Sequence, residues 1–126
     1  MKKSNNKGFS LVESIIVIAI MAVLVGLLAP QYLKYVHNSK VSTDISNAQD
    51  MATAINVAFA DDQIHSGDAV TTLPNGDAFP VSKVNSSYSW AVTVDDDGVS
   101  QITLNGKEIY PDPKASGNYY AEEHKN

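Results

Sequence analysis

One acidic side chain stands alone beside a long apolar stretch near the start of the chain. Glu13 directly precedes Ser14 to Leu33, and no residue of that run is charged. An acidic group within a membrane costs roughly 2.5 to 3.5 kcal/mol even on a lenient insertion scale. A place near the beginning of a helix lowers this cost, because the helix dipole is positive there. Either another group compensates for the charge of Glu13, or its side chain extends back to the cytoplasmic interface.

The other groups that could do chemistry form no convergent set. His37, His65 and His124 are far apart in the sequence and lack the spacing of metal ligands. Residues 95–98, three Asp and a Gly, favour a hairpin turn and do not have EF-hand spacing. The chain has no cysteine, which removes disulfides, thiolate metal sites and cysteine nucleophiles. We expect no enzyme activity, no metal and no cofactor.

The charge balance argues against one class of partner. The 126 residues fit one small domain plus an appendage, with nine basic and fourteen acidic residues. All the basic residues are lysines, and Lys2, Lys3 and Lys7 lie at the very start. Without residues 1–8, six lysines face fourteen acids, a formal charge of −8. A surface this acidic disfavours nucleic-acid binding by bulk electrostatics.

The apolar run is long enough for a membrane-spanning helix. A helix needs about 20 apolar residues to cross the hydrocarbon layer. The lysines before the run and the acidic sequence after it predict a cytoplasmic N-terminus and an extracytoplasmic remainder. A cleaved secretory signal is disfavoured, because its apolar core has only about 7 to 15 residues and no A-x-A site follows here.

A second helical pattern continues directly from the first. Apolar residues recur at steps of three and four from Val41 to Phe59, as in an amphipathic helix with one apolar stripe. Lys40, Asp44 and Asp50 lie between them and are expected on the polar side. One helix is predicted from about Phe9 to about Asp62. The stripe expected to pack on the rest of the domain consists of Val41, Ile45, Ala48, Ala52, Ile55 and Phe59.

The following residues change to the period of a β-strand. Apolar and polar residues alternate from Tyr88 to Val94, including Trp90, and the extended pattern resumes from Val99 to Leu104. Asn105-Gly106 favours a type I′ turn, after which residues 107–110 can return as a third strand. Residues 79–84 can add another strand, which Pro80 weakens. The fold class is therefore α+β, with a long N-terminal helix packed on a small antiparallel β-meander.

The N-terminal residues resemble the class III signal of type IV prepilins. In that family a short basic leader ends in Gly, the mature chain begins with Phe or Met, and Glu is the fifth mature residue. Lys7, Gly8, Phe9 and Glu13 match at each place. The resemblance is specific over about residues 7–36.

The resemblance implies a processing and assembly role for these residues. A prepilin peptidase would cut between Gly8 and Phe9 and methylate the new amine of Phe9. That amine would then pair with Glu13 of an adjacent subunit. From the residues themselves, Pro30 removes a hydrogen bond to the Gly26 carbonyl, which makes this turn the weakest part of the helix. We expect residues around 22–30 to unwind in part during assembly.

The predicted function is that of a structural type IV pilus subunit, stored in the membrane and polymerised into an extracellular filament for adhesion, motility or DNA uptake. The expected partners are other copies, the prepilin peptidase, the membrane, and the pilus assembly platform with its ATPase. One alternative is a pseudopilin of a type II secretion or competence system. Another is a single-pass membrane protein whose outer domain binds a ligand.

The expected division of the chain has five parts. These are a cleaved leader at 1–8, a membrane and filament-core helix half at 9–36, an amphipathic helix half at 37–64, a connecting loop at 65–78, and a sheet with an irregular C-terminal tail at 79–126. The tail beyond Tyr110 contains prolines, glycine and mixed charges, which predict a partly mobile segment.

Overall fold

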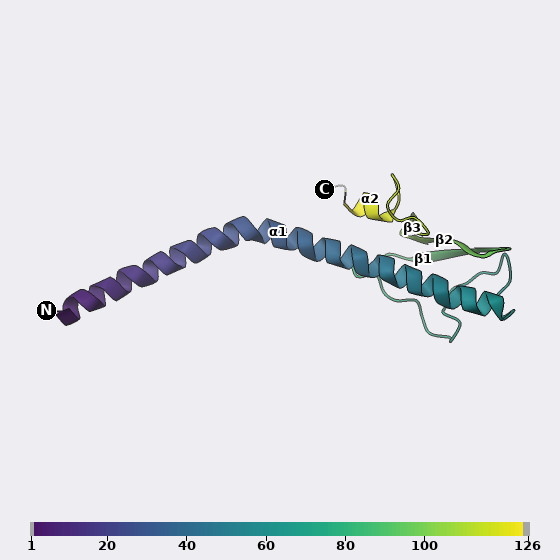
Figure 1. The fold of residues 1–126 in the computed structure, drawn as a ribbon, viewed down its shortest axis with the longest axis horizontal. Helices are drawn as coiled ribbons and strands as arrows, with labels where there is room; N and C mark the ends of the chain where they lie inside the picture. Colours follow the sequence, from purple (N-terminus) through teal and green to yellow (C-terminus); the bar gives the residue numbers. More distant parts are fainter. Residues whose placement is uncertain (1, 125–126) are drawn as a thin grey trace. The chain divides into compact units, whose positions relative to one another are not determined.

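A computed structural model describes the backbone of residues 2–124 and the side chains of residues 10–124. Its elements follow the order of one long helix, three strands and one short helix. The prediction of an α+β chain with a long N-terminal helix and a small antiparallel sheet is confirmed (Figure 1).

Helix α1, Lys2–Ala60, contains both helical patterns of the sequence. It ends two residues before the predicted end, where Asp62 takes a positive φ of 63°. By its contacts the chain divides into two units, one ending at Val36 and the other beginning at His37. We call residues 10–36 the apolar segment and residues 37–124 the sheet domain.

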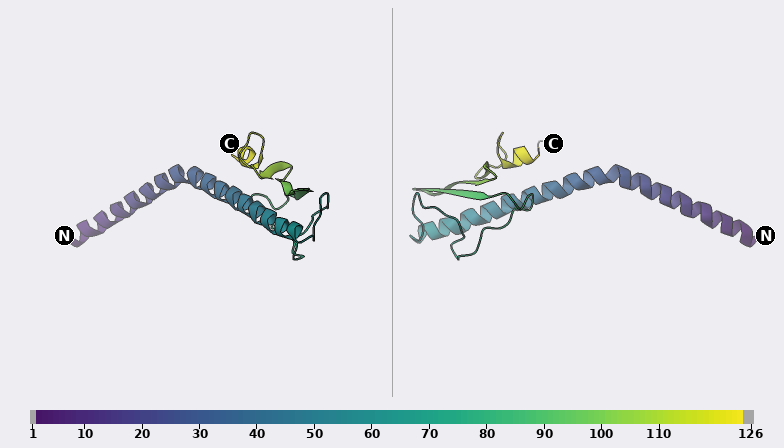
Figure 2. Two further views of the ribbon diagram at one scale, coloured as in Figure 1. Left: turned by 45° about the vertical axis from the view of Figure 1, so that its right-hand side comes forward. Right: turned by 180° about the vertical axis from the view of Figure 1, so that it is seen from behind.

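The sheet consists of β1 (Trp90–Asp95), β2 (Gly98–Leu104) and β3 (Lys107–Tyr110), paired antiparallel in this order. Asn105 and Gly106 have φ values of 54° and 76°. Two adjacent positive φ angles are what a type I′ turn requires, so the turn between β2 and β3 agrees with the sequence. Within the sheet domain, the strands lie alongside the last part of α1 in both views of Figure 2.

The core of the sheet domain lies between α1 and the sheet. Alternate residues of β2 point toward the helix, as the two-residue strand period requires. The buried cluster contains Val41, Ala48, Met51, Ala52, Ile102, Leu104, Ile109 and Tyr119. Tyr119 belongs to α2, Tyr119–Glu123, a short helix that sequence periodicity did not predict.

Two expectations for the irregular regions are wrong. Residues 79–84 form no strand, and Pro80 instead offers its carbonyl to the Trp90 indole N–H at 2.7 Å. The segment beyond Tyr110 is not simply an irregular tail, since it contains α2, and the Tyr119 side chain is only 1% exposed. The burial of one aromatic ring holds this segment against the core.

Candidate assembly site

Glu13 lies on α1 among side chains that face outward. Ser10, Ser14, Val17 and Ile18 surround it and line a shallow hollow on the helix surface. Within residues 10–124, no hydrogen bond or ion pair reaches the Glu13 carboxylate. The carboxylate is therefore available to a group from outside this part of the chain.

The apolar segment has no covering layer of its own. Every side chain from Ser10 to Tyr35 is exposed, and the large apolar ones are 47% exposed at Val17 and up to 72% at Tyr35. Over the described residues, one helix is long and apolar enough to span a membrane, on length and composition alone. An exposed apolar surface of this extent marks a membrane or protein contact.

The two predicted helix-weakening residues lie inside continuous helix. Pro30 is within α1, and the helix includes Gly26 as well. A Cβ built on Gly26 would meet nothing within 4 Å. No packing within the chain therefore demands glycine at this position. The side chains of Gly8 and Phe9, the predicted processing site, lie outside the described residues.

Most of the predicted packing stripe is buried, but the buried face of α1 also includes residues outside the stripe. Val41, Ala48, Ala52 and Ile55 are at most 1% exposed. The outer members, Ile45, Phe59 and Trp90, are partly buried, and Ile45 and Trp90 pack against the buried cluster. Three further buried residues, Asp44, Met51 and Ala58, were not in the predicted stripe.

Asp44 is the functional residue that sequence reasoning missed. It was expected on the polar side of the helix, and its side chain is fully buried. Asp44, Met51 and Ala58 recur every seven residues, the repeat of a buried helix face. That spacing could have placed the aspartate in the core, although nothing in it identifies the partners of a buried carboxylate.

The Asp44 carboxylate joins three parts of the sheet domain. The Ser82 hydroxyl donates to Oδ2 at 2.6 Å, and the Lys83 backbone N–H donates to Oδ1 at 2.8 Å. The Tyr119 hydroxyl donates to Oδ2 at 2.8 Å. Burial raises the pKa of Tyr119 well above its usual range, and the bond to Asp44 adds to this rise. Helix α1, the loop before β1 and α2 thus meet at the buried Asp44 carboxylate.

Two further polar side chains of α1 extend this attachment. His37 Nε2 lies 2.8 Å from the Glu123 carbonyl oxygen and 3.4 Å from its carboxylate. At the other end of the domain, Asn56 Oδ1 accepts the Val99 N–H at 2.8 Å. His37 and His124 are far apart in the sequence but close in the folded domain. Their rings lie 6.5 Å apart, and His124 stacks on Tyr120 with a centroid distance of 3.9 Å.

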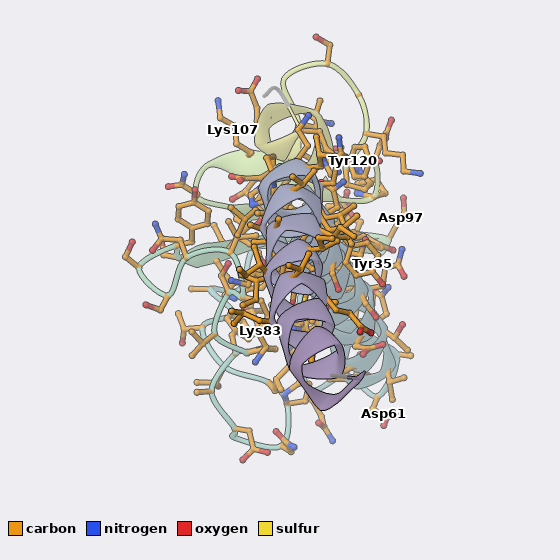
Figure 3. The ribbon with its side chains drawn as sticks, turned by 90° about the vertical axis from the view of Figure 1, so that its left-hand side faces the viewer. Tyr35, Asp61, Lys83, Asp97, Lys107 and Tyr120 are labelled. Atoms are coloured by element: carbon orange, nitrogen blue, oxygen red, sulfur yellow. The ribbon has the colours of Figure 1, made fainter. Side chains whose placement is uncertain are left out.

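The surface of the sheet domain carries its charges outward. Asp61, Asp97, Lys83 and Lys107 are all exposed, and Figure 3 labels each of them. Among the described residues, no group of three or more His, Asp or Glu side chains is arranged to hold a metal ion. An open hollow of about 470 Å³ is lined by α1 residues near Ile45 and by residues 112–114 and Tyr120.

Comparison with known proteins agrees with the fold described above, a long N-terminal helix followed by a small antiparallel sheet. Residues 3–29 match the family model for the prokaryotic N-terminal methylation motif. The chain therefore carries this motif at its N-terminus.

Two kinds of relatives extend the similarity beyond the motif. The type IV major fimbrial protein FimA of Dichelobacter nodosus is 42% identical over 59 residues, which cover 47% of this chain and 38% of the relative. The type IV major pilin protein PilE1 of Neisseria gonorrhoeae is 33% identical over 88 residues, or 70% of this chain and 39% of the relative. The matches thus span about two fifths of the length of these relatives. No solved structure is significantly similar to the chain.

Proposed function

We propose that this chain is a structural, non-enzymatic subunit of a type IV pilus, inserted in the membrane as a precursor and polymerised into an extracellular filament. The carrying observation is an uncovered apolar helix whose one acidic side chain, Glu13, lies inside the methylation motif. Lipid can cover that surface before assembly, and the helices of other copies can cover it in a filament.

Processing would prepare the chain for this transfer. We propose cleavage between Gly8 and Phe9 by a prepilin peptidase, followed by N-methylation of Phe9. The amine so formed would pair with Glu13 of the neighbouring copy. A charge pair that forms away from water acts strongly, and its main effect is to fix the axial register of the subunits.

The weak turn of the helix has a role in the same proposal. Pro30 lacks the N–H that would bond to the Gly26 carbonyl, so unwinding around residues 22–30 breaks fewer hydrogen bonds than elsewhere in α1. Partial unwinding there would let the apolar segment adjust its length to a filament core. The open space around Gly26 also allows another helix to approach closely.

The remaining partners follow from this mechanism. The N-terminus would lie in the cytoplasm and the sheet domain outside, with assembly driven by a membrane platform and its ATPase. The leader at 1–8 would be removed, and residues 9–36 would form the filament core. The same processing would serve a pseudopilin, whose filament is short.

Two measurements test the proposal. Mass spectrometry of the mature protein should find methylated Phe9 as its first residue. Electron microscopy of producing cells should find long surface filaments that contain the chain. An intact Met1 would refute the pilin proposal, and methylated Phe9 without surface filaments but with a secretion or uptake defect would identify a pseudopilin.

A further inference from the structure

The segment after the third strand forms a closed loop of its own. We call residues 111–124 the strap. The Tyr120 N–H donates to the Pro113 carbonyl at 2.8 Å, and the Asn118 amide donates to the Asp112 carbonyl at 2.6 Å. These bonds lie within the strap, so they do not depend on its contacts with the rest of the sheet domain.

Two carboxylates join the strap to α1 and to the segment before β1. Asp44 of α1 accepts the Tyr119 hydroxyl, and Glu123 of the strap accepts the Tyr88 hydroxyl at 3.1 Å. His37 of α1 contacts Glu123 as well. Bonds to a charged acceptor are stronger than neutral ones, so these few contacts carry much of the attachment.

A third carboxylate, Glu108, joins the base of the strap to β3. Glu108 Oε2 accepts the Asn118 amide at 3.2 Å and the Asp112 N–H at 3.3 Å. Pro111 begins the segment there, and Gly117, with a φ of +84°, lies just before α2. The strap is therefore attached to β3 at its base, separately from its contacts with α1 and Tyr88.

We propose that the strap is a latch that opens and closes on the sheet domain as one unit, held shut by the Asp44 and Glu123 carboxylates. When it opens, Tyr119 leaves the buried cluster that contains Val41 and Ile109. Asp44 keeps the Ser82 and Lys83 donors, so its carboxylate stays hydrogen-bonded in the open state. The proposal holds whether or not the chain polymerises.

The rest of the domain has the contacts to remain folded during this motion. The β1–β2 ladder extends from Trp90↔Leu104 to Asp95↔Gly98 without any strap residue. The loop before it remains fixed to α1 through Asp44, and the β1–β2 turn remains fixed through Asn56. Opening of a locally attached unit below the global unfolding free energy is a general property of folded proteins.

Hydrogen exchange of the full chain in detergent micelles, followed by mass spectrometry, tests the latch. Tyr119→Phe removes one hydroxyl and keeps the ring. We expect strap amides to exchange about tenfold faster, the effect of losing one bond to a charged group, and β1 and β2 amides to change less than about twofold. Ser82→Ala is the matched control, because it removes a donor from the same carboxylate on the loop side. It should leave strap exchange within about twofold of wild type.

Two outcomes would overturn the latch. Equal acceleration of the strap and of β1 and β2 in Tyr119→Phe would mean that they open together. Unchanged strap exchange would mean that Asp44 does not hold it. If Tyr119→Phe fails to fold, Tyr88→Phe tests the Glu123 side of the strap with the same expected pattern. If the exchange pattern is as expected but filaments are absent, the proposed function is contradicted and the latch is not.

Discussion

The apolar segment and the sheet domain share one helix, α1, and differ in what covers its side chains. Before Val36 every described side chain is exposed, whereas after His37 one face is covered by the sheet and α2. The second half is stabilised by burial within its own chain. The first half has no such cover, so its helix depends on a surrounding of another kind, which lipid or other copies can provide.

The polar residues of the two halves illustrate the same difference. Asp44 has at least three close donors inside the sheet domain, and Glu13 has none within residues 10–124. A buried carboxylate with internal partners stabilises a fold. A carboxylate of the apolar segment that lacks such internal partners is suited to an ion pair with another molecule.

The largest expected effect separates assembly from folding. Glu13→Val should reduce filament yield by more than about tenfold, since it leaves the amine of the neighbouring copy without its proposed partner in apolar surroundings. The thermal unfolding of the sheet domain, followed by Trp90 fluorescence, should not change. Equal filament yield in the variant would break the contrast between the two carboxylates.

Asp44→Ala, unlike Glu13→Val, should destabilise the sheet domain itself. It leaves the Ser82 and Tyr119 hydroxyls and the Lys83 N–H without their acceptor, which should lower the free energy of unfolding by about 3 kcal/mol or more. Urea unfolding in detergent measures this. Asp50→Ala, at an exposed position of the same helix, is the control and should change stability by less than about 0.5 kcal/mol.

Gly98→Ala tests the fit between the helix and the first hairpin. Gly98 has a φ of +112°, and a Cβ there would lie 2.5 Å from Asn56 Oδ1. We expect a loss of about 2 kcal/mol from strain and from the displaced Asn56–Val99 bond. Gly76→Ala, with a φ of +92° but open space around it, should cost less, and equal costs would show that the contact with Asn56 does not matter.

Gly26→Ala should act on the apolar segment alone. Because nothing lies within 4 Å of the added methyl group, the helix should gain about 1 kcal/mol of local stability. Circular dichroism in micelles should show higher thermal stability of the helix. Filament yield should fall, because unwinding and close helix approach both become harder, and a normal yield would contradict that role of Gly26.

The smallest expected effect concerns the ionisation of Tyr119, which changes the free energy of unfolding only at alkaline pH. Its pKa is raised in the folded state, by burial and then by the bond to Asp44. Its contribution is therefore complete below the unfolded-state pKa of about 10 and decreases as the pH rises above that value. Wild type should lose stability between pH 9 and pH 11 more steeply than Tyr119→Phe. Identical slopes would remove the ionisation of Tyr119 as a cause.

Sequence periodicity predicted those elements that are determined by residues close together in the sequence. The bounds of β3 and the turn at Asn105-Gly106 follow from alternation and from glycine-compatible dihedral angles. The same reasoning failed for residues 79–84 and for the segment after Tyr110. These segments have no period, because single contacts to distant residues hold them, such as Trp90 to Pro80 and Tyr119 to Asp44.

The sequence alone determined the apolar helix, the methylation motif with Glu13, and an α+β chain, because charge, hydrophobicity and spacing are local properties of the residues. Only the tertiary structure identified the donors around Asp44 and showed that the strap is ordered. The physical reason is that a carboxylate enters a core only where donors meet it. Here those donors come from Ser82, Lys83 and Tyr119, which lie 38 to 75 residues away along the chain.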